Sequence, residues 1–175
     1  MKTEERAARV ELILSDVDGV MTDGSVVFDN QGIETKLFHI RDGLGIKLWR
    51  RAGYRFGVIT GRSSQIVRMR AAELGVDIVR QGVEDKLAVV EQIVAELGLE
   101  PQQVCYVGDD LPDLPVVRFV GLGVAVADGS EDLRRAAHYV TTTPGGRGAV
   151  RETIELVLKA QGRWEDQIQK YGGKG

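Results

Sequence analysis

Two aspartates one residue apart, Asp16 and Asp18, closely follow the apolar run 12–14 and precede Gly19. If that run is a buried strand, both carboxylates lie at its C-terminal end, where open α/β sheets place their active sites. Two neighbouring anions repel each other, so the pair favours a bound cation, and oxygen ligands suit Mg²⁺. Aspartate and glycine also form ordinary turns after strands, so the pair alone leaves both interpretations open.

Two other polar groups have similar positions along the chain. Thr60 and Gly61 follow the apolar run 56–59, and backbone amides near a helix start there could bind phosphate oxygens. Lys86 stands at the start of a helical pattern, where a cation opposes the helix dipole. An anionic ligand would account for that position, and a solvated surface lysine is the alternative.

A third polar group is strongly acidic. Asp109, Asp110 and Asp113 follow the apolar run 104–107 and Gly108. Three carboxylates at the end of a buried strand indicate a cation site. One of them is also suited to cap the helix that follows.

The elements that must position these groups alternate along the chain. Nearly continuous apolar runs indicate strands buried on both faces, and segments with apolar residues at helical spacing separate them. The expected strands are residues 10–14, 56–59, 104–107 and 122–126, and the expected helices are 44–52, 65–74, 86–97 and 114–119. This alternation predicts an α/β fold with a doubly wound, Rossmann-like parallel sheet. A single domain over residues 1–175 is expected, with a frayed tail at about 165–175.

One segment breaks the alternation. Residues 25–40 indicate a β-hairpin that projects beyond the sheet as a flap. Its apolar side chains Val27, Phe28, Leu37 and Phe38 would be exposed unless something covers them. A contact between copies of the chain is the favoured cover, and folding of the flap over its own domain is the alternative.

Composition limits the function classes. The net charge of −3 and the lack of a basic block argue against a nucleic-acid partner. No apolar stretch approaches the length of a membrane span, so we predict a cytoplasmic protein with no membrane partner. Cys105 is the one cysteine and is expected to be buried in a strand. His39 and His138 have no metal-ligand spacing and are expected to be structural, His39 on the flap.

Taken in order, Asp-x-Asp, Thr60, Lys86 and Gly-Asp-Asp-x-x-Asp resemble the motifs of the haloacid dehalogenase superfamily of aspartate-nucleophile phosphatases. The resemblance extends over about residues 10–151. It implies that Asp16 is the nucleophile and that Asp18 donates and then accepts a proton. Thr60 and Lys86 would hold the transferring oxygens.

The same resemblance implies a Mg²⁺ cofactor. Its ligands would be Asp16, the backbone carbonyl of Asp18 and the side chain of Asp109. The ion would offset the repulsion between the carboxylate and the phosphate. Asp110 and Asp113 would orient waters, the lysine or the metal shell.

Response-regulator receiver domains contain similar parts and are the alternative from a different class. Their acidic pair comes first in the chain, whereas here the acidic group that begins at Asp109 comes last. Asp18 also supplies a proton shuttle two residues from the nucleophile, which suits turnover rather than storage of a phospho-signal. Steady phosphate release from p-nitrophenyl phosphate would distinguish the two, since a stored signal gives at most one equivalent.

Further segments resemble the 3-deoxy-D-manno-octulosonate 8-phosphate (KDO 8-phosphate) phosphatases, a family of tetramers. The flap leads into Arg-Asp-Gly at residues 41–43, and Gly-Gly-Arg-Gly stands at residues 145–148. No stretch between the motifs has room for a cap domain, so the chain is expected to be capless. The resemblance implies a homotetramer that hydrolyses a small-molecule sugar acid phosphate, a step towards lipopolysaccharide.

Arginines would recognise the sugar acid, because guanidinium groups bind carboxylates in a bidentate manner. Arg62 follows Gly61, which would bind substrate with Thr60, and Arg70 lies about two helical turns further on, on roughly the same face. Arg147 lies in the glycine-rich loop. A solvated arginine is the alternative for each.

Phosphatases for nine-carbon ketodeoxy sugar acids are the nearer alternative. That group resembles this chain too, but it tends to carry a glutamate where Arg62 stands and a lysine where Glu73 stands. The sequence therefore favours the eight-carbon substrate, and it leaves the role of Glu73 open.

Overall fold

The computed structural model describes residues 1–76 and 78–172, and its centre is a six-stranded sheet in the order β5-β4-β1-β6-β7-β8. Every strand pairing in this sheet is parallel. The strands are β1 (Leu12–Ser15), β4 (Arg55–Ile59), β5 (Ile78–Arg80), β6 (Val104–Gly108), β7 (Leu122–Ala125) and β8 (Tyr139–Val140). The predicted α/β fold with a doubly wound parallel sheet is confirmed.

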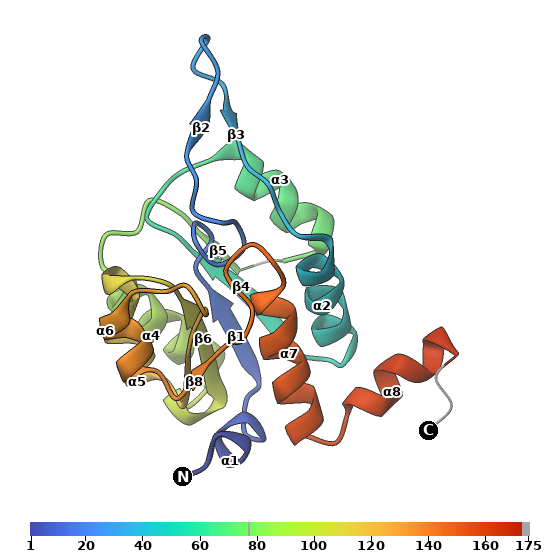
Figure 1. Ribbon diagram of the computed structural model, residues 1–175. Coiled ribbons are helices and arrows are strands. Elements are labelled where there is room, and N and C mark those ends of the chain that lie inside the picture. Colours follow the sequence, from blue (N-terminus) through green and yellow to red (C-terminus); the bar gives the residue numbers. More distant parts are fainter. Residues whose placement is uncertain (77, 173–175) are drawn as a thin grey trace.

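Helices cover both faces of the sheet (Figure 1). Side chains alternate along β1, so that Ile13 packs into one core while Leu12 and Leu14 pack into the other. The first core contains residues of α1 (Thr3–Ala7), α2 (Ile40–Arg51), α3 (Gln65–Leu74) and α7 (Ala149–Ala160). The second contains residues of α4 (Lys86–Leu97), α5 (Leu114–Phe119) and α6 (Glu131–Ala136).

The central strand β1 lies between β4 and β6. Its last residue, Ser15, pairs with Val58 on one side and with Val107 on the other. Because the three strands run in the same direction and end together, the loops that follow them leave the same edge of the sheet. That edge carries the polar groups singled out in the sequence.

Helix α2 begins at Ile40, earlier than the predicted start at residue 44. His39 is its N-cap, and the ring Nδ1 accepts a hydrogen bond from the backbone amide of Arg41 at 3.3 Å. His39 is structural, as predicted. It caps the start of α2, however, and the prediction that it lies on the flap is wrong. Gly43 and Gly45 interrupt the apolar pattern near the start of this helix. A Cβ at Gly43 would overlap the guanidinium of Arg70 on α3, and a Cβ at Gly45 would crowd Arg151 on α7.

The C-terminal part is more regular than expected. The prediction of a frayed tail from about residue 165 is wrong as far as Tyr171, because α8 (Trp164–Ile168) and the 3₁₀-helix η3 (Gln169–Tyr171) continue the chain. The side chain of Arg51 donates hydrogen bonds to Gln167, which fixes α8 against α2. The rest of the predicted tail, residues 173–175, lies outside the described residues.

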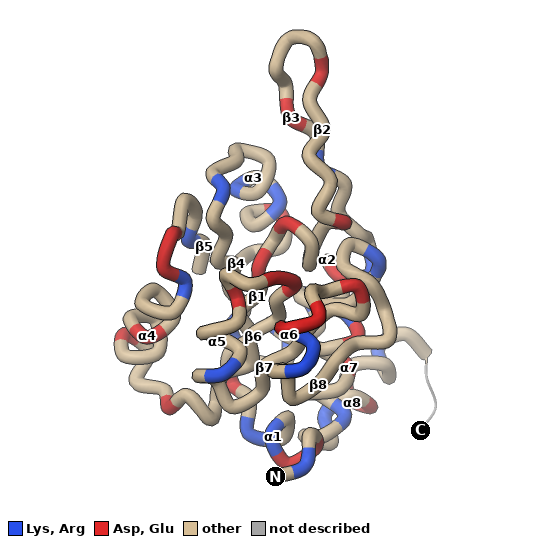
Figure 2. The backbone as a smooth tube through the Cα atoms, turned by 60° about the vertical axis from the view of Figure 1, so that its left-hand side comes forward, with Lys and Arg blue, Asp and Glu red and all other residues tan. Residues whose placement is uncertain are grey.

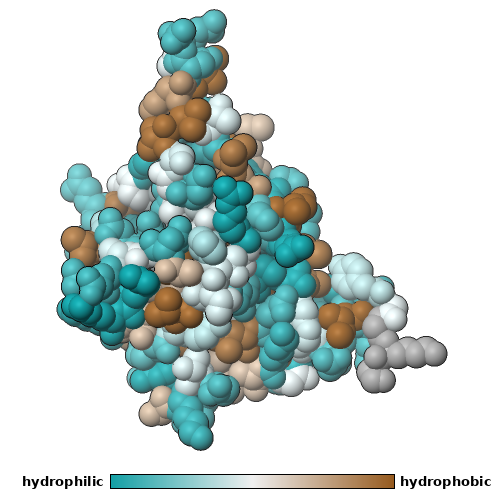
Figure 3. Space-filling view, in the orientation of Figure 1, coloured by the Kyte–Doolittle hydropathy of each residue, from teal (hydrophilic) through white to brown (hydrophobic). Residues whose placement is uncertain are grey.

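The predicted flap is present, but its strands are short. They are β2 (Val27–Phe28) and β3 (Glu34–Thr35), and the hairpin projects well beyond the sheet (Figures 1 and 2). Val27, Phe28 and Leu37 are exposed, whereas Phe38 packs against the first core. Figure 3 shows the resulting apolar surface along the flap.

Among the described residues, no helix has both the length and the apolar character that crossing a membrane requires. Cys105 is buried in β6, as predicted. His138 has a structural role, since its Nδ1 accepts a hydrogen bond from the Gly123 amide at 2.9 Å.

Candidate active site

Three aspartates from two neighbouring strand ends meet at the edge of the sheet. Asp16 follows β1, Asp109 follows β6, and Asp113 ends the short 3₁₀-helix η2 (Leu111–Asp113). One carboxylate oxygen of each lies within 4.8 Å of the others. The backbone amide of Asp16 donates to the carbonyl of Val107 at 2.9 Å, so the pairing of β1 with β6 sets this geometry.

Lys86 is buried between two of these carboxylates. Its Nζ lies 2.8 Å from Asp16 Oδ2 and 2.7 Å from Asp113 Oδ1, and its side chain is 4% exposed. The alternative of a solvated surface lysine is therefore wrong. The lysine stands at the unfavourable end of α4 because the two carboxylates outweigh the helix dipole there, while Asp85 caps the helix.

Asp113 organises the cluster. Its Oδ1 accepts from Lys86 and from the Tyr106 hydroxyl, each at 2.7 Å, and its Oδ2 accepts from the backbone amide of Asp109 at 2.9 Å. These bonds occupy both oxygens, so Asp113 suits an orienting role better than that of a metal ligand. Asp110 is exposed and caps η2.

Crowding of the carboxylates shows in their proton affinities. Burial and the charge of Asp113 raise the pKa of Asp16 to about 6, although Lys86 opposes this. Burial, Asp113 and Asp16 raise the pKa of Asp109 to about 8. A divalent cation would relieve this repulsion, and the all-oxygen donor set fits Mg²⁺.

We expect Mg²⁺ affinity to rise with pH between about 6 and 8. The ion needs ionised carboxylates, and the raised pKa values of Asp16 and Asp109 mean that protons compete with it in this range. Binding should therefore release protons, which calorimetric titration in buffers of different ionisation enthalpy measures. Asp109→Asn should weaken binding and reduce the proton release. An affinity independent of pH over this range would contradict the prediction.

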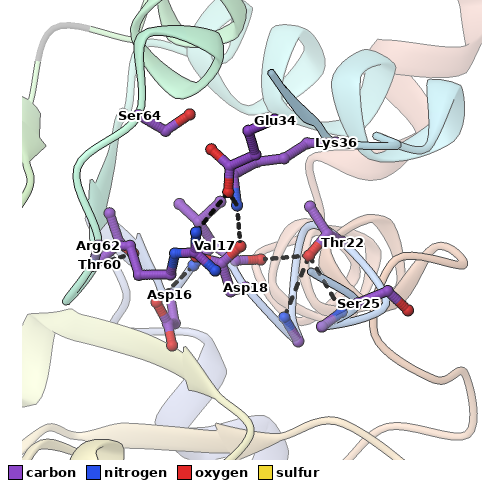
Figure 4. A network of polar contacts seen from close by, with 12 residues as sticks. Asp16, Val17, Asp18, Thr22, Ser25, Glu34, Lys36, Thr60, Arg62 and Ser64 are labelled. Carbon is purple, nitrogen blue, oxygen red and sulfur yellow. Dashed lines mark hydrogen bonds and ion pairs between the residues drawn. The ribbon is translucent and has the colours of Figure 1, made fainter. Parts of the chain in front are cut away.

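Asp18 does not join the three clustered carboxylates. Its side chain makes an ion pair with Lys36 at the base of the flap (Figure 4). Gly19, directly after Asp18, has φ +90°, and a Cβ there would overlap the carboxylate of Asp109. Glycine is therefore required where this loop crosses the acidic cluster.

Thr60 and Gly61 lie at the end of β4, beside the end of β1. The Thr60 side chain is buried, and its Oγ1 accepts from the backbone amide of Arg62 at 3.4 Å. Gly61 is exposed, and a Cβ there would make an ordinary contact with the Val83 carbonyl at 3.5 Å. The threonine hydroxyl and the exposed turn after it are thus available at the same sheet edge as Asp16.

The structure separates two arginines that the sequence placed on one helix face. Nη2 of Arg62 lies 2.7 Å from Glu34 on the flap. Arg70 instead pairs with Glu73 at 2.7 Å and lies against Gly43 of α2. Arg62 precedes α3, which starts at Gln65, so the expected common helix face is wrong. The first turn of α2 passes close to α3, and the Arg70 guanidinium packs against Gly43 there. Glu73 is the partner of Arg70 in this ion pair, and its side chain is 60% exposed.

The glycine-rich loop directly contacts the loop between β1 and β2, residues 16–26. The amide of Gly146 donates to the Val20 carbonyl at 2.8 Å, and the amide of Gly145 donates to Asp128 Oδ1 at 2.9 Å. A Cβ at Gly145 would overlap the Gly19 carbonyl. This contact explains why two glycines are needed there.

Arg147 is exposed and lines an open cavity of about 680 Å³ together with Arg41 and Arg151. Helix α7 starts just after this loop, and Asp42 of α2 accepts the Arg151 amide at 2.8 Å. Gly148, the N-cap of α7, has no side chain, so a carboxylate from another helix caps it.

Glu34, Lys36 and Asp128 also lie near the site, and the sequence did not single them out. For Glu34 and Lys36 the available signal was their alternation, with Thr35 between them, in an expected strand. For Asp128 the sequence carries no such signal, because its partner Gly145 lies 17 positions further along the chain. Asp42 belongs to the Arg-Asp-Gly segment noted in the sequence, but its contact with Arg151, 109 positions away, leaves no local pattern.

A buried aspartate lies beside a lysine and two further aspartates at the end of a central parallel strand, as the resemblance to the haloacid dehalogenase superfamily implies. The family model of the haloacid dehalogenase-like hydrolases matches residues 66–153. The 3-deoxy-D-manno-octulosonate 8-phosphate phosphatase KdsC of Yersinia pestis is 47% identical over 161 residues, 92% of this chain and 86% of the relative. Its counterpart in Escherichia coli K12 is 44% identical with the same coverage.

Solved structures indicate the same family as the sequence relatives. The crystal structure of the Yersinia pestis phosphatase superposes with a TM-score of 0.92 and covers 93% of this chain and 88% of that chain. A Moraxella catarrhalis phosphatase, solved with a magnesium ion, a phosphate ion and a KDO molecule, is 42% identical with a TM-score of 0.95, covering 97% of each chain. The chain belongs to the family of the KDO 8-phosphate phosphatases.

Proposed function

We propose that this chain hydrolyses KDO 8-phosphate to the free sugar acid and inorganic phosphate, with Mg²⁺ as cofactor. The observation that carries the proposal is the buried Asp16 carboxylate, held 2.8 Å from Lys86 at the carboxyl edge of the sheet. Similarity to KDO 8-phosphate phosphatases over 92% of the chain supports the choice of substrate. The reaction would be a step towards lipopolysaccharide, and a cytoplasmic location stays a prediction.

Asp16 and Asp18 share the bond-making steps in this proposal. A carboxylate oxygen of Asp16 forms a bond to phosphorus while the bond from phosphorus to the sugar oxygen breaks. Asp18 gives a proton to the departing oxygen. It then takes a proton from the water that attacks the aspartyl phosphate, which restores Asp16 and releases inorganic phosphate.

Other residues hold the phosphoryl group and the ion. Lys86 and the Thr60 hydroxyl, with the turn at Gly61, would bind the phosphoryl oxygens. Asp16, the Asp18 carbonyl and Asp109 would bind Mg²⁺, which when bound neutralises charge on the transferring group. The exposed Asp110 would orient a water of the metal shell.

Two arginines are candidates for the sugar carboxylate. The Arg62 side chain is 39% exposed at the end of β4, and Arg147 is exposed in the glycine-rich loop. We assign Arg70 to the contact between α2 and α3, because Glu73 and Gly43 hold it there.

The test is a comparison of kcat/KM across a panel of sugar acid phosphates. We expect KDO 8-phosphate to be preferred over nine-carbon ketodeoxy sugar acid phosphates by at least about tenfold, the range that a few changed pocket contacts give. Chelation by EDTA should remove activity, and added Mg²⁺ should restore it. Preference for a nine-carbon substrate, or full activity in EDTA, would refute the proposal.

We further propose that the chain forms a homotetramer through the flap. The exposed apolar side chains of the flap, including Phe28 and Leu37, support a contact between copies. Phe28→Asp should give smaller species in analytical ultracentrifugation, because burying a carboxylate in such a contact is costly. Gln31→Asp at the polar tip is the matched control and should leave the assembly intact. Smaller species for wild type would contradict the proposal.

A further inference from the structure

Lys36 at the base of the flap pairs with Asp18, in the loop between β1 and β2. Its Nζ contacts Asp18 Oδ1 and lies 3.3 Å from Glu34 Oε1, and its side chain is 1% exposed. Burying an ammonium group costs free energy unless carboxylates accompany it, and here two do. In the described part of the chain, Lys36 is the one cation that pairs with Asp18.

The position of Lys36 follows from the strand. Side chains alternate along β3 and its continuation, so Glu34 and Lys36 share the face toward the loop between β1 and β2 (Figure 4). Thr35 and Leu37 belong to the other face and are exposed. Glu34 also binds Arg62. The flap is thus tied by ion pairs to the loop after β1 and to the loop after β4.

Asp18 is held at one oxygen and free at the other. Oδ1 pairs with Lys36, while Oδ2 is buried and has no hydrogen-bond partner among the described residues. A proton donor has to be held in one orientation toward the leaving oxygen, because misplacement sacrifices the advantage of proximity. The pairing of Oδ1 with Lys36 fixes the carboxyl group, and Oδ2 stays free to carry the transferred proton.

We propose that Lys36 is a positioning residue that orients Asp18 for proton transfer to the leaving group. The inference rests on the proposed function, since it takes Asp18 as the proton donor. Lys36 acts through Asp18 and needs no contact with substrate. The flap then contributes to the reaction of its own subunit, in addition to any contact with other copies.

Leaving groups of different basicity test this proposal. An alkoxide needs a proton when it departs, whereas p-nitrophenolate does not. For Lys36→Met we expect kcat/KM to fall at least about tenfold for KDO 8-phosphate and for a simple alkyl phosphate, but less than about threefold for p-nitrophenyl phosphate. Lys36→Arg should recover most of the loss, because a guanidinium can also bind the Asp18 carboxylate.

Thr35→Ala, on the outward face of the same strand, is the matched control and should leave all three substrates unaffected. Thermal midpoints measured for each variant separate folding from chemistry. Equal losses on all substrates, no loss, or a gain in activity would each overturn the positioning role. If wild type fails on KDO 8-phosphate while the difference between alkyl and nitrophenyl phosphates persists, the proposed substrate is wrong and the role of Lys36 stands.

Discussion

Replacing Asp16 with asparagine is expected to lower kcat by about 10⁴-fold or more, the loss typical when a nucleophile is removed. The amide has nearly the same shape but cannot attack phosphorus. Steady-state phosphate release, with KDO 8-phosphate and with p-nitrophenyl phosphate, measures the loss. The two substrates should be affected alike, because both need the nucleophile.

The same variant should remain as stable as wild type in the absence of Mg²⁺. The folded-state pKa of Asp16 is raised from 3.8 to about 6. The free energy of unfolding therefore falls as the pH rises through this range, and at pH 7 the ionised carboxylate destabilises the fold. Removing that charge offsets the lost pairing with Lys86. Thermal unfolding at pH 7 checks this expectation, and a normal kcat in Asp16→Asn would refute the nucleophile assignment.

Replacing Lys86 with methionine should produce the largest loss of stability, about 3–5 kcal/mol. Methionine fills a similar volume but leaves the buried carboxylates of Asp16 and Asp113 without their cation. Burial lowers the pKa of Lys86, yet the two carboxylates raise it more, so its folded-state pKa lies above 10.5. Its contribution to stability is therefore fully present at pH 7 and is lost only at alkaline pH above that value.

Urea unfolding of Lys86→Met in EDTA measures this loss. Lys159→Met is the control, because Lys159 pairs with Glu155 at 2.9 Å on an exposed part of α7. The control should cost at most about 1 kcal/mol. Added Mg²⁺ should restore part of the stability of Lys86→Met, since a cation again lies among the carboxylates. Similar small losses in both variants would show that the buried pairs contribute little.

The sequence predicted the central fold because its strands are buried on both faces and its helices are amphipathic. It did not predict the true start of α2, since Gly43 and Gly45 interrupt the apolar pattern where other helices pack closely. Helices α6 and α7 were also absent from the prediction. For α7 the signal was present in the spacing of Val150, Ile154 and Val157, all of which are buried.

For the site, the order of motifs predicted which strand ends would carry the acids, and the parallel sheet brings them together. The sequence could not show that Lys86 is buried, because that depends on Asp113, a residue 27 positions away. The place of Arg70 depends likewise on α2 rather than on its own helix. Contacts of this kind arise from packing between elements and leave no local pattern.

Cys105 lies fully buried in β6, and burial raises the pKa of its thiol. Since the chain has no other cysteine, the native protein offers no accessible thiolate to maleimide reagents. A Gln31→Cys variant would therefore carry one reactive thiol, in the exposed turn of the flap. A spin label or a dye there would report on flap movement, without removal of any native residue elsewhere.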